Sequence, residues 1–187
     1  MGIIRINDLS ELTSFVLLHQ SGGNFEQTKV AILGGSGGHG VMLSDRCESL
    51  GLSVPEITGS TRKKLEAILP AFGSAKNPID MTAQAGRDPG MPFKCLRVLA
   101  EADGIDIIFM QLFYSDKKTV KELIEIKQST NKAIVITARK NADDAEEEEN
   151  HRLIREAGMP VMYEGLQVVK AIADLSWYQR KVRRARE

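Results

Sequence analysis

The chain has 187 residues with 25 basic and 25 acidic side chains, so its formal net charge is zero. This balance gives no global attraction to nucleic acid or to an anionic membrane surface, and we expect neither partner. The length fits one domain with a sizeable core, and the apolar fraction of 42% and charged fraction of 27% are ordinary for a globular protein.

Cysteine content and the chain start indicate a cytoplasmic protein. Cys47 and Cys95 stand apart, without a CxxC pair or a Cys/His cluster. We therefore expect a reduced compartment and no metal site. No segment approaches the roughly 18 to 20 apolar residues of a membrane span. Residues 1–8 also lack the charged region and apolar run of a signal peptide.

The expected elements alternate between helices and short apolar strands. A first helix begins after a capping-box spacing from Asp8 to Glu11, and glycines at 22–23 end it. The apolar run 29–33 does not alternate, as is typical of a strand covered on both faces. Further helices are expected at 38–50, 60–69, 91–102, 117–128, 143–157 and 166–184. Further strands are expected at 54–57, 105–113, 133–138 and 160–163, with a loop over 73–92.

This order of elements predicts the fold class. Strands that alternate with helices indicate a parallel sheet with helices on both faces. Five or six short strands suit a flavodoxin-like α/β fold, a three-layer sandwich with a mainly parallel sheet. The sequence contains no internal repeat and no long linker, so residues 1–187 are expected to form a single domain.

A glycine-rich turn follows the 29–33 strand. Residues 34–40 read Gly-Gly-Ser-Gly-Gly-His-Gly and lead into the next helix. Ligands of open α/β sheets collect at the carboxyl ends of strands. Glycine allows unusual φ values and close approach of a ligand, and the free N–H groups at a helix start bind anions. The turn is therefore predicted to cradle a phosphate.

Other interpretations of the turn stay open at this point. The glycines of 35–40 also match the G-x-G-x-x-G fingerprint of dinucleotide-binding domains, with Glu56 as the acidic residue about twenty positions on. The structural alternative is that the glycines only form a tight turn and allow close helix packing. No lysine follows in the Walker arrangement, so the turn is not a P-loop.

The three histidines differ in their surroundings. His39 lies inside the turn and is the one candidate for a catalytic role, against the alternative of a residue at the helix start without chemical function. His19 ends an amphipathic helix and His151 lies in a charged one, so both are expected at the surface. No His, Cys and Asp set has metal spacing, and no Gly-x-Ser-x-Gly elbow is present.

A second polar segment covers residues 77–82, which read Asn-Pro-Ile-Asp-Met-Thr. Pro78 keeps the preceding residue extended, while Asn77 and Asp80 can hydrogen-bond backbone or ligand. We interpret the segment as a structural turn, with a binding loop as the alternative.

Several of these segments resemble the NDP-forming acyl-CoA synthetases. The stretch 30–41 is similar to the turn of that family, which typically reads Asn-Ser-Gly-Gly-Pro-Gly-Val with a nearby Ala-Asp, here Ser44-Asp45. Further matches lie at 61–70, 77–82 and 158–161, so the resemblance covers nearly the whole chain. The chain looks like the third domain of such a synthetase, a flavodoxin-like ligase-CoA domain similar to the carboxy-terminal domain of the succinyl-CoA synthetase beta subunit.

The resemblance implies a reaction shared between domains. The family converts acyl-CoA, NDP and phosphate to the acid, CoA and NTP, through an acyl phosphate and a phosphohistidine. The CoA-binding, phosphohistidine and ATP-grasp domains, which handle CoA, nucleotide and Mg²⁺, are expected elsewhere in a larger protein or on other subunits. The chain is then a fragment or subunit that holds no cofactor tightly and is inactive alone. Whether it forms a homo-oligomer stays open.

The resemblance also implies residue roles. The helix after the turn is one of two whose positive ends face the phosphohistidine. Its phosphate-binding donors are expected from Gly35, Ser36, Gly37, Gly38 and His39. Asn77 and Asp80 are expected to order the adjoining loop. His39 departs from the family, which usually has proline there, and it either adds a charged donor or marks an inactive relative.

Two functions from other classes remain as alternatives. One is a non-catalytic regulatory or docking domain, as in protein acyltransferases with degenerate synthetase-like domains. The other is a free-standing nucleotide or flavin binder, against which the lack of an aromatic residue near the turn counts.

Overall fold

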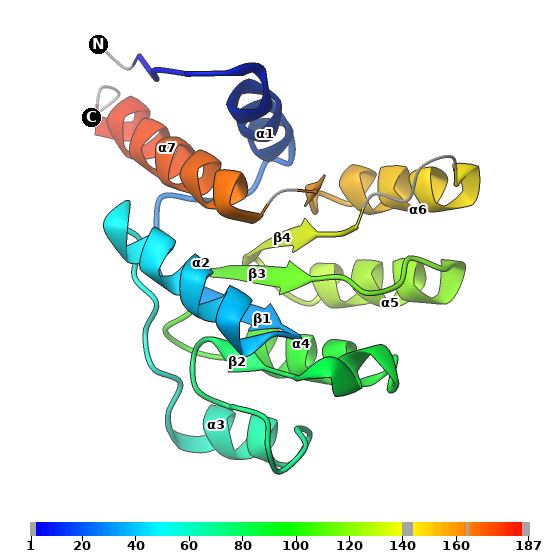
Figure 1. Cartoon of the computed structure of the whole chain (residues 1–187). Coiled ribbons are helices and arrows are strands. Elements are labelled where there is room, and N and C mark those ends of the chain that lie inside the picture. Colours follow the sequence, from blue (N-terminus) through cyan, green and yellow to red (C-terminus); the bar gives the residue numbers. More distant parts are fainter. Residues whose placement is uncertain (1–2, 140–143, 164, 185–187) are drawn as a thin grey trace.

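Five parallel strands form the central sheet of the computed structural model, which describes residues 3–139, 144–163 and 165–184 (Figure 1). In chain order the strands are β1 (Val30–Gly34), β2 (Ile79–Asp80), β3 (Ile107–Gln111), β4 (Ala133–Thr137) and β5 (Val161–Met162). Their spatial order is β2-β1-β3-β4-β5, and every pair is parallel. This is the flavodoxin-like strand order, so the predicted fold class is confirmed.

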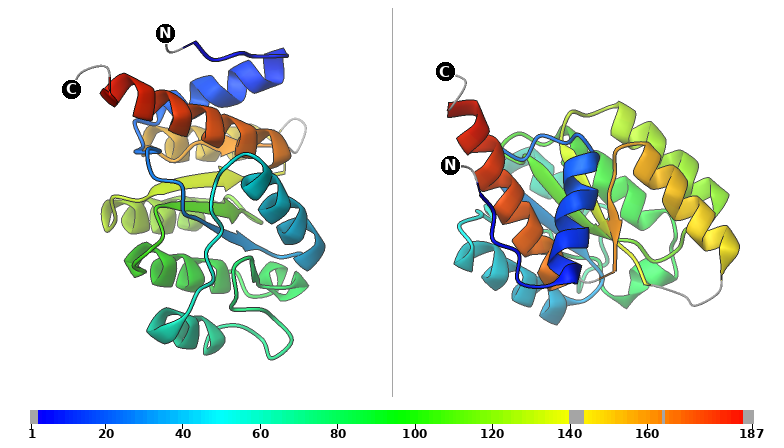
Figure 2. Two further views of the ribbon diagram at one scale, coloured as in Figure 1. Left: turned by 90° about the vertical axis from the view of Figure 1, so that its left-hand side faces the viewer. Right: turned by 90° about the horizontal axis from the view of Figure 1, so that it is seen from above.

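Helices cover both faces of the sheet (Figures 1 and 2). They are α1 (Leu9–Gln20), α2 (Gly37–Ser49), α3 (Gly59–Glu66), α4 (Met91–Glu101), α5 (Lys117–Gln128), α6 (Ala145–Glu156) and α7 (Gly165–Arg184), with a short 3₁₀ helix, η1 (Ala83–Gly86). Helices α2 and α7 pack on one face, and α1 lies beside α7. Helices α3 to α6 pack on the other face.

Alternate side chains of each central strand enter the two halves of the core. On β1, Val30 and Ile32 face α2 and α7, whereas Ala31 and Leu33 face α3 to α6. All four side chains are buried. Burial on both faces explains why the strand reads as a continuous apolar run without alternation.

The second strand in the chain lies elsewhere than expected. The segment 54–57 was predicted as a strand, but it forms none, and only an isolated bridge joins Ser53 to Lys29. The second strand is instead β2, which lies inside the stretch predicted as a loop and pairs with β1, with Leu33 opposite Ile79. The prediction was wrong because pairing with β1, and not local composition, decides which short segment becomes the strand.

Buried His151 is a second correction. It was expected at the surface, but the residue is only 1% exposed because α6 turns it toward β5. Its Nδ1 atom lies 3.3 Å from the hydroxyl oxygen of Tyr163. Burial lowers the pKa of the imidazole. His19 is exposed, as expected.

The helix ends carry caps and charges of the expected sign. The Asp8 carboxylate accepts hydrogen bonds from the N–H groups of Ser10 and Glu11 at the start of α1. The predicted start of α6 at residue 143 lies outside the described residues.

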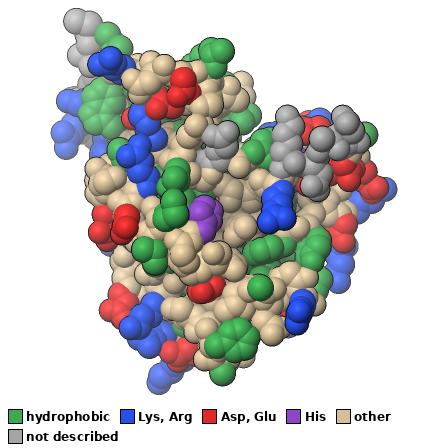
Figure 3. Space-filling view, in the orientation of Figure 1, with side chains coloured by type: hydrophobic (Ala, Val, Ile, Leu, Met, Phe, Trp, Pro, Cys, Tyr) green, Lys and Arg blue, Asp and Glu red, His purple; other side chains and the backbone are tan. Residues whose placement is uncertain are grey.

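On the face drawn in Figure 3, acidic and basic side chains are interspersed, as the zero net charge suggests. Within the described ranges, no helix is long and apolar enough to cross a membrane.

Candidate functional site

The candidate site lies at the carboxyl edge of the sheet, where the chain leaves β1. Strand β1 lies between β2 and β3, so the segments that follow these three strands meet around the glycine-rich turn. Such edges of doubly wound sheets are where ligands bind.

The turn leads directly into α2. Ser36 takes an extended conformation before the helix, and its carbonyl accepts the first helical hydrogen bond, from the Gly40 N–H at 3.0 Å. The first N–H groups of a helix have no partner within it, so those of Gly37, Gly38 and His39 point out of its start. Ser36, Gly37 and Gly38 are exposed, and the Ser36 side chain makes no capping bond. The positive end of α2 is therefore open to solvent.

Packing, and not positive φ, accounts for Gly35 and Gly40 of the turn. In the described part of the chain, the glycines with positive φ all lie outside 34–40, so the turn does not use this conformational freedom of glycine. A Cβ at Gly35 would lie 2.5 Å from the Phe113 ring, and one at Gly40 would lie 3.0 Å from Pro78. A Cβ at Gly38 would meet no atom within 4 Å. The structural alternative thus explains Gly35 and Gly40, but it leaves Gly38 unexplained.

Asp80 and Thr82, at the end of β2, pack against the turn. The Asp80 carboxylate accepts a hydrogen bond from the Thr82 N–H at 2.8 Å, and its other oxygen points at Gly37. Thr82 has φ 60° and ψ −179°, a region that β-branched residues rarely occupy. Its carbonyl oxygen would be 3.1 Å from a Cβ at Gly35. The backbone strain at Thr82 thus coincides with the close packing against the turn.

Asn77 fixes the same loop to β1. Its side-chain oxygen accepts a hydrogen bond from the Ile32 N–H at 2.9 Å. Its side-chain nitrogen donates to the carbonyls of Val30 at 2.7 Å and Pro55 at 3.1 Å. The Asn77 amide therefore makes the hydrogen bonds to β1 that a neighbouring strand would make, just before β2 begins.

An aromatic side chain lies beside the turn, contrary to expectation. The ring of Phe113 packs against Gly35, and Gln111 at the end of β3 accepts a hydrogen bond from the Gly35 N–H at 3.3 Å. The sequence hides this contact because Phe113 is distant from the turn along the chain. The Gly35 N–H is already engaged, so the free donors begin after it.

His39 lies between the starts of two helices. Its side chain is half-buried, and its Nε2 atom would be 3.3 Å from a Cβ at Gly165, the first residue of α7. Leu43 packs against the same glycine. The imidazole therefore adjoins the start of α7 as well as that of α2.

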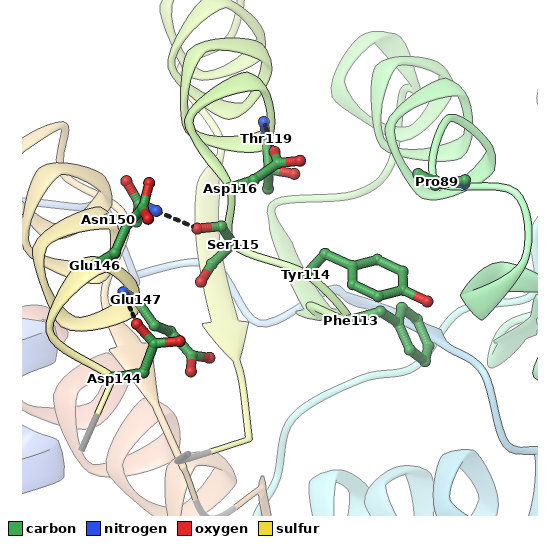
Figure 4. Close-up of a pocket in the computed structure, with 10 residues that line it drawn as sticks. All are labelled: Pro89, Phe113, Tyr114, Ser115, Asp116, Thr119, Asp144, Glu146, Glu147 and Asn150. Atoms are coloured by element: carbon green, nitrogen blue, oxygen red, sulfur yellow. Dashed lines mark hydrogen bonds between the residues drawn. The ribbon is translucent and has the colours of Figure 1, made fainter. Parts of the chain in front are cut away.

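A cavity of about 430 Å³ opens farther along the same edge, at the starts of α5 and α6 (Figure 4). It is lined by Pro89, Phe113, Tyr114, Ser115, Asp116, Thr119, Asp144, Glu146, Glu147 and Asn150. Asp116 and Asp144 cap the two helices by accepting from the N–H groups of Thr119 and Glu147. The cavity is thus lined by several carboxylates, and the starts of both helices are already capped.

Fold and edge geometry define a flavodoxin-like α/β domain with an exposed helix start after β1. Residues 30–114 match the family model of the Ligase-CoA domain. The ADP-forming acetate–CoA ligase I of Archaeoglobus fulgidus is 28% identical over 182 residues, which are 96% of this chain and 25% of that protein. The alpha subunit of the ADP-forming acetate–CoA ligase I of Pyrococcus furiosus is 25% identical over 97% of this chain and 40% of its own length. The resemblance to NDP-forming acyl-CoA synthetases is thereby confirmed.

A solved structure shows the same fold. The dinucleotide-forming acetyl-coenzyme A synthetase 1 of Ca. Korarchaeum cryptofilum, in complex with phosphate and ADP, superposes with a TM-score of 0.78 at 16% identity. The alignment covers 96% of this chain and 39% of that one. The chain thus spans about a quarter to two fifths of the lengths of these three proteins.

Proposed function

We propose that the chain is the phosphate-cradling domain of an ADP-forming acyl-CoA synthetase-like protein, and that it is inactive on its own. The observation that carries the proposal is the exposed start of α2 at the carboxyl edge of the sheet, with free space beside Gly38. A phosphoryl group there would accept hydrogen bonds from the N–H groups of Gly37, Gly38 and His39. The matches to ADP-forming acetate–CoA ligases make phosphate the expected anion.

In this proposal the phosphoryl group arrives on a histidine of another domain. Charge compensation by a helix start is worth up to about 2 kcal/mol when partly buried, which is useful to a site that must hold an anion without reacting with it. CoA, nucleotide and Mg²⁺ are assigned to other domains of the parent protein. Asn77 and Asp80 act as supports of the loop that borders the turn.

Exposed apolar side chains near the turn support docking of a second domain. Val41 and Met42 on α2 are 56% and 54% exposed, and Leu166 in the first turn of α7 is 39% exposed. Large apolar side chains beside a polar site are typical of surfaces that a partner covers. A domain that delivers a phosphohistidine to α2 would cover these side chains.

The test uses Gly38, because a side chain fits there without a clash. We expect phosphate and sulfate to raise the melting temperature of the chain, since a ligand at ten times its Kd stabilises by about 1.4 kcal/mol. Gly38→Glu places a carboxylate at the helix start and should abolish the response. Gly38→Gln, which has the same shape without the charge, should retain most of it.

Two outcomes would contradict the proposal. One is a phosphate response that is equal in the wild type and in Gly38→Glu. The other is stabilisation by FMN, NAD or CoA but not by inorganic anions, which would indicate a self-sufficient cofactor site instead.

A further inference from the structure

Thr137, at the end of β4, carries a buried hydroxyl without a partner. The residue is 6% exposed, and its Oγ1 atom makes no hydrogen bond to any residue that the structure describes. Buried hydroxyls are nearly always hydrogen-bonded, because an unsatisfied one destabilises the fold. The described residues therefore leave this hydroxyl free to hydrogen-bond a further group.

The side chain of Thr137 lies on the same face of the sheet as α2 and α7. Along β4, Ala133 and Val135 pack into the core half beneath these helices, whereas Ile134 and Ile136 pack into the other half. Alternation along the strand places Thr137 with Ala133 and Val135. Because Thr137 is the last residue of β4, its hydroxyl lies at the carboxyl edge, as the glycine-rich turn does.

The register of the sheet pairs Thr137 with residues that lead to the turn on one side and to α7 on the other. On one side it pairs with Gln111 of β3, the residue that accepts the Gly35 N–H of the turn. On the other side it pairs with Met162 of β5, three residues before α7 begins at Gly165. Gly165 in turn adjoins His39 in the first turn of α2. The turn, Gln111, Thr137 and the start of α7 thus lie around one part of the carboxyl edge of the sheet.

We propose that the Thr137 hydroxyl is a further ligand of the phosphoryl group held at α2, and that it donates a hydrogen bond to a phosphoryl oxygen from the β4 side. The inference rests on the proposed function and extends it, because it gives the site a side-chain donor from a strand two places away from β1. The ligand chemistry is a phosphoryl oxyanion, for which inorganic phosphate is the probe. The acidic cavity beside α5 is not part of this site.

Thr137→Val tests the proposal on the whole chain. Valine has nearly the same shape and removes only the hydroxyl. Loss of a hydrogen bond to a charged group should weaken phosphate binding about tenfold, measured by calorimetric titration. Without phosphate, the melting temperature should stay the same or rise, because the variant removes an unsatisfied buried group. Thr137→Ser keeps the hydroxyl and should bind phosphate within about twofold of the wild type.

Thr119→Val is the matched control. Thr119 is also a buried threonine, but it lies on α5, where its N–H donates to the Asp116 carboxylate and its side chain interacts with the same group. This variant should lose stability and keep its phosphate affinity. Phosphate affinity unchanged in Thr137→Val would overturn the inference, as would an equal loss in Thr137→Ser and Thr137→Val.

The Gly38 variants distinguish failure of the proposed function from failure of this inference alone. If phosphate binding depends on Gly38 but not on Thr137, the proposed function holds and this inference fails. If the wild type binds no phosphate, or binds it independently of Gly38, the proposed function fails and the inference fails with it.

Discussion

The Asp80 carboxylate lies against Gly37, with its Oδ2 atom 2.8 Å from the position that a Cβ would occupy on that glycine. The carboxylate is held by the Thr82 N–H, so it cannot simply swing away. Asp80 thereby determines which residue can begin α2. It also brings a negative charge to the border of the proposed phosphate site.

Because of this contact, substitutions at Gly37 and Asp80 should be coupled in their effects on the free energy of unfolding. Gly37→Ala should lower the free energy of unfolding by about 1–3 kcal/mol, because its methyl group overlaps the carboxylate. In an Asp80→Ala background the same change should cost much less, so a double-mutant cycle by urea denaturation should show positive coupling. Gly38→Ala, where a methyl meets no atom within 4 Å, should be neutral or slightly stabilising. Equal costs of Gly37→Ala in both backgrounds would contradict the overlap.

Asn77 is predicted to be important for stability. Asn77→Ala removes three hydrogen bonds and leaves the Ile32 N–H and the Val30 carbonyl without these partners. We expect a loss of about 2–4 kcal/mol in the free energy of unfolding, since buried groups left unsatisfied cost about 1–3 kcal/mol each. Asn77→Asp keeps the acceptor for Ile32 but sets a carboxylate against two carbonyls, so it should also destabilise. A loss below about 0.5 kcal/mol for Asn77→Ala would show that water replaces the amide.

His151 is predicted to make stability depend on pH. Burial lowers the pKa of His151 in the folded state, an effect that Glu147 and Glu148 oppose and Arg155 reinforces. The unfolded chain therefore binds a proton that the folded chain does not, and the stability contributed by neutral His151 is lost as the pH falls below about 6.5. Urea unfolding measured at about pH 7.5 and at about pH 5, on either side of the ordinary histidine pKa, should show this decrease. His151→Gln should reduce the slope, and an unchanged slope would exclude His151 as its source.

Both cysteines are predicted to be unreactive in the folded protein. Burial raises the pKa of Cys47 and that of Cys95 to about 12 in each case. Alkylation requires the thiolate and access, so a thiol reagent at about pH 8 should modify neither residue in the native chain. Both should react in denaturant, as counted by mass spectrometry. Rapid modification of either cysteine in the native chain would show that its side of the core opens readily.

The positions of most elements could be predicted from local patterns. The apolar run before Gly34 and the glycines after it place a buried strand and a helix start side by side, because both signals lie within a few neighbouring residues. The short strand β2 escaped prediction, since two residues carry almost no periodicity and their pairing depends on β1.

Only the part of the candidate site that the glycine-rich turn forms was predictable from the sequence. The sequence alone determined a parallel α/β sheet and a helix start rich in N–H donors at its carboxyl edge, because hydrophobic periodicity and glycine content act over short stretches. Tertiary structure decided that Phe113 packs on Gly35, that Asp80 faces Gly37, that His151 is buried and that Thr137 lies unpartnered at the same edge. These contacts join residues far apart in the chain, and strand register and helix packing, which local propensity does not encode, set their positions.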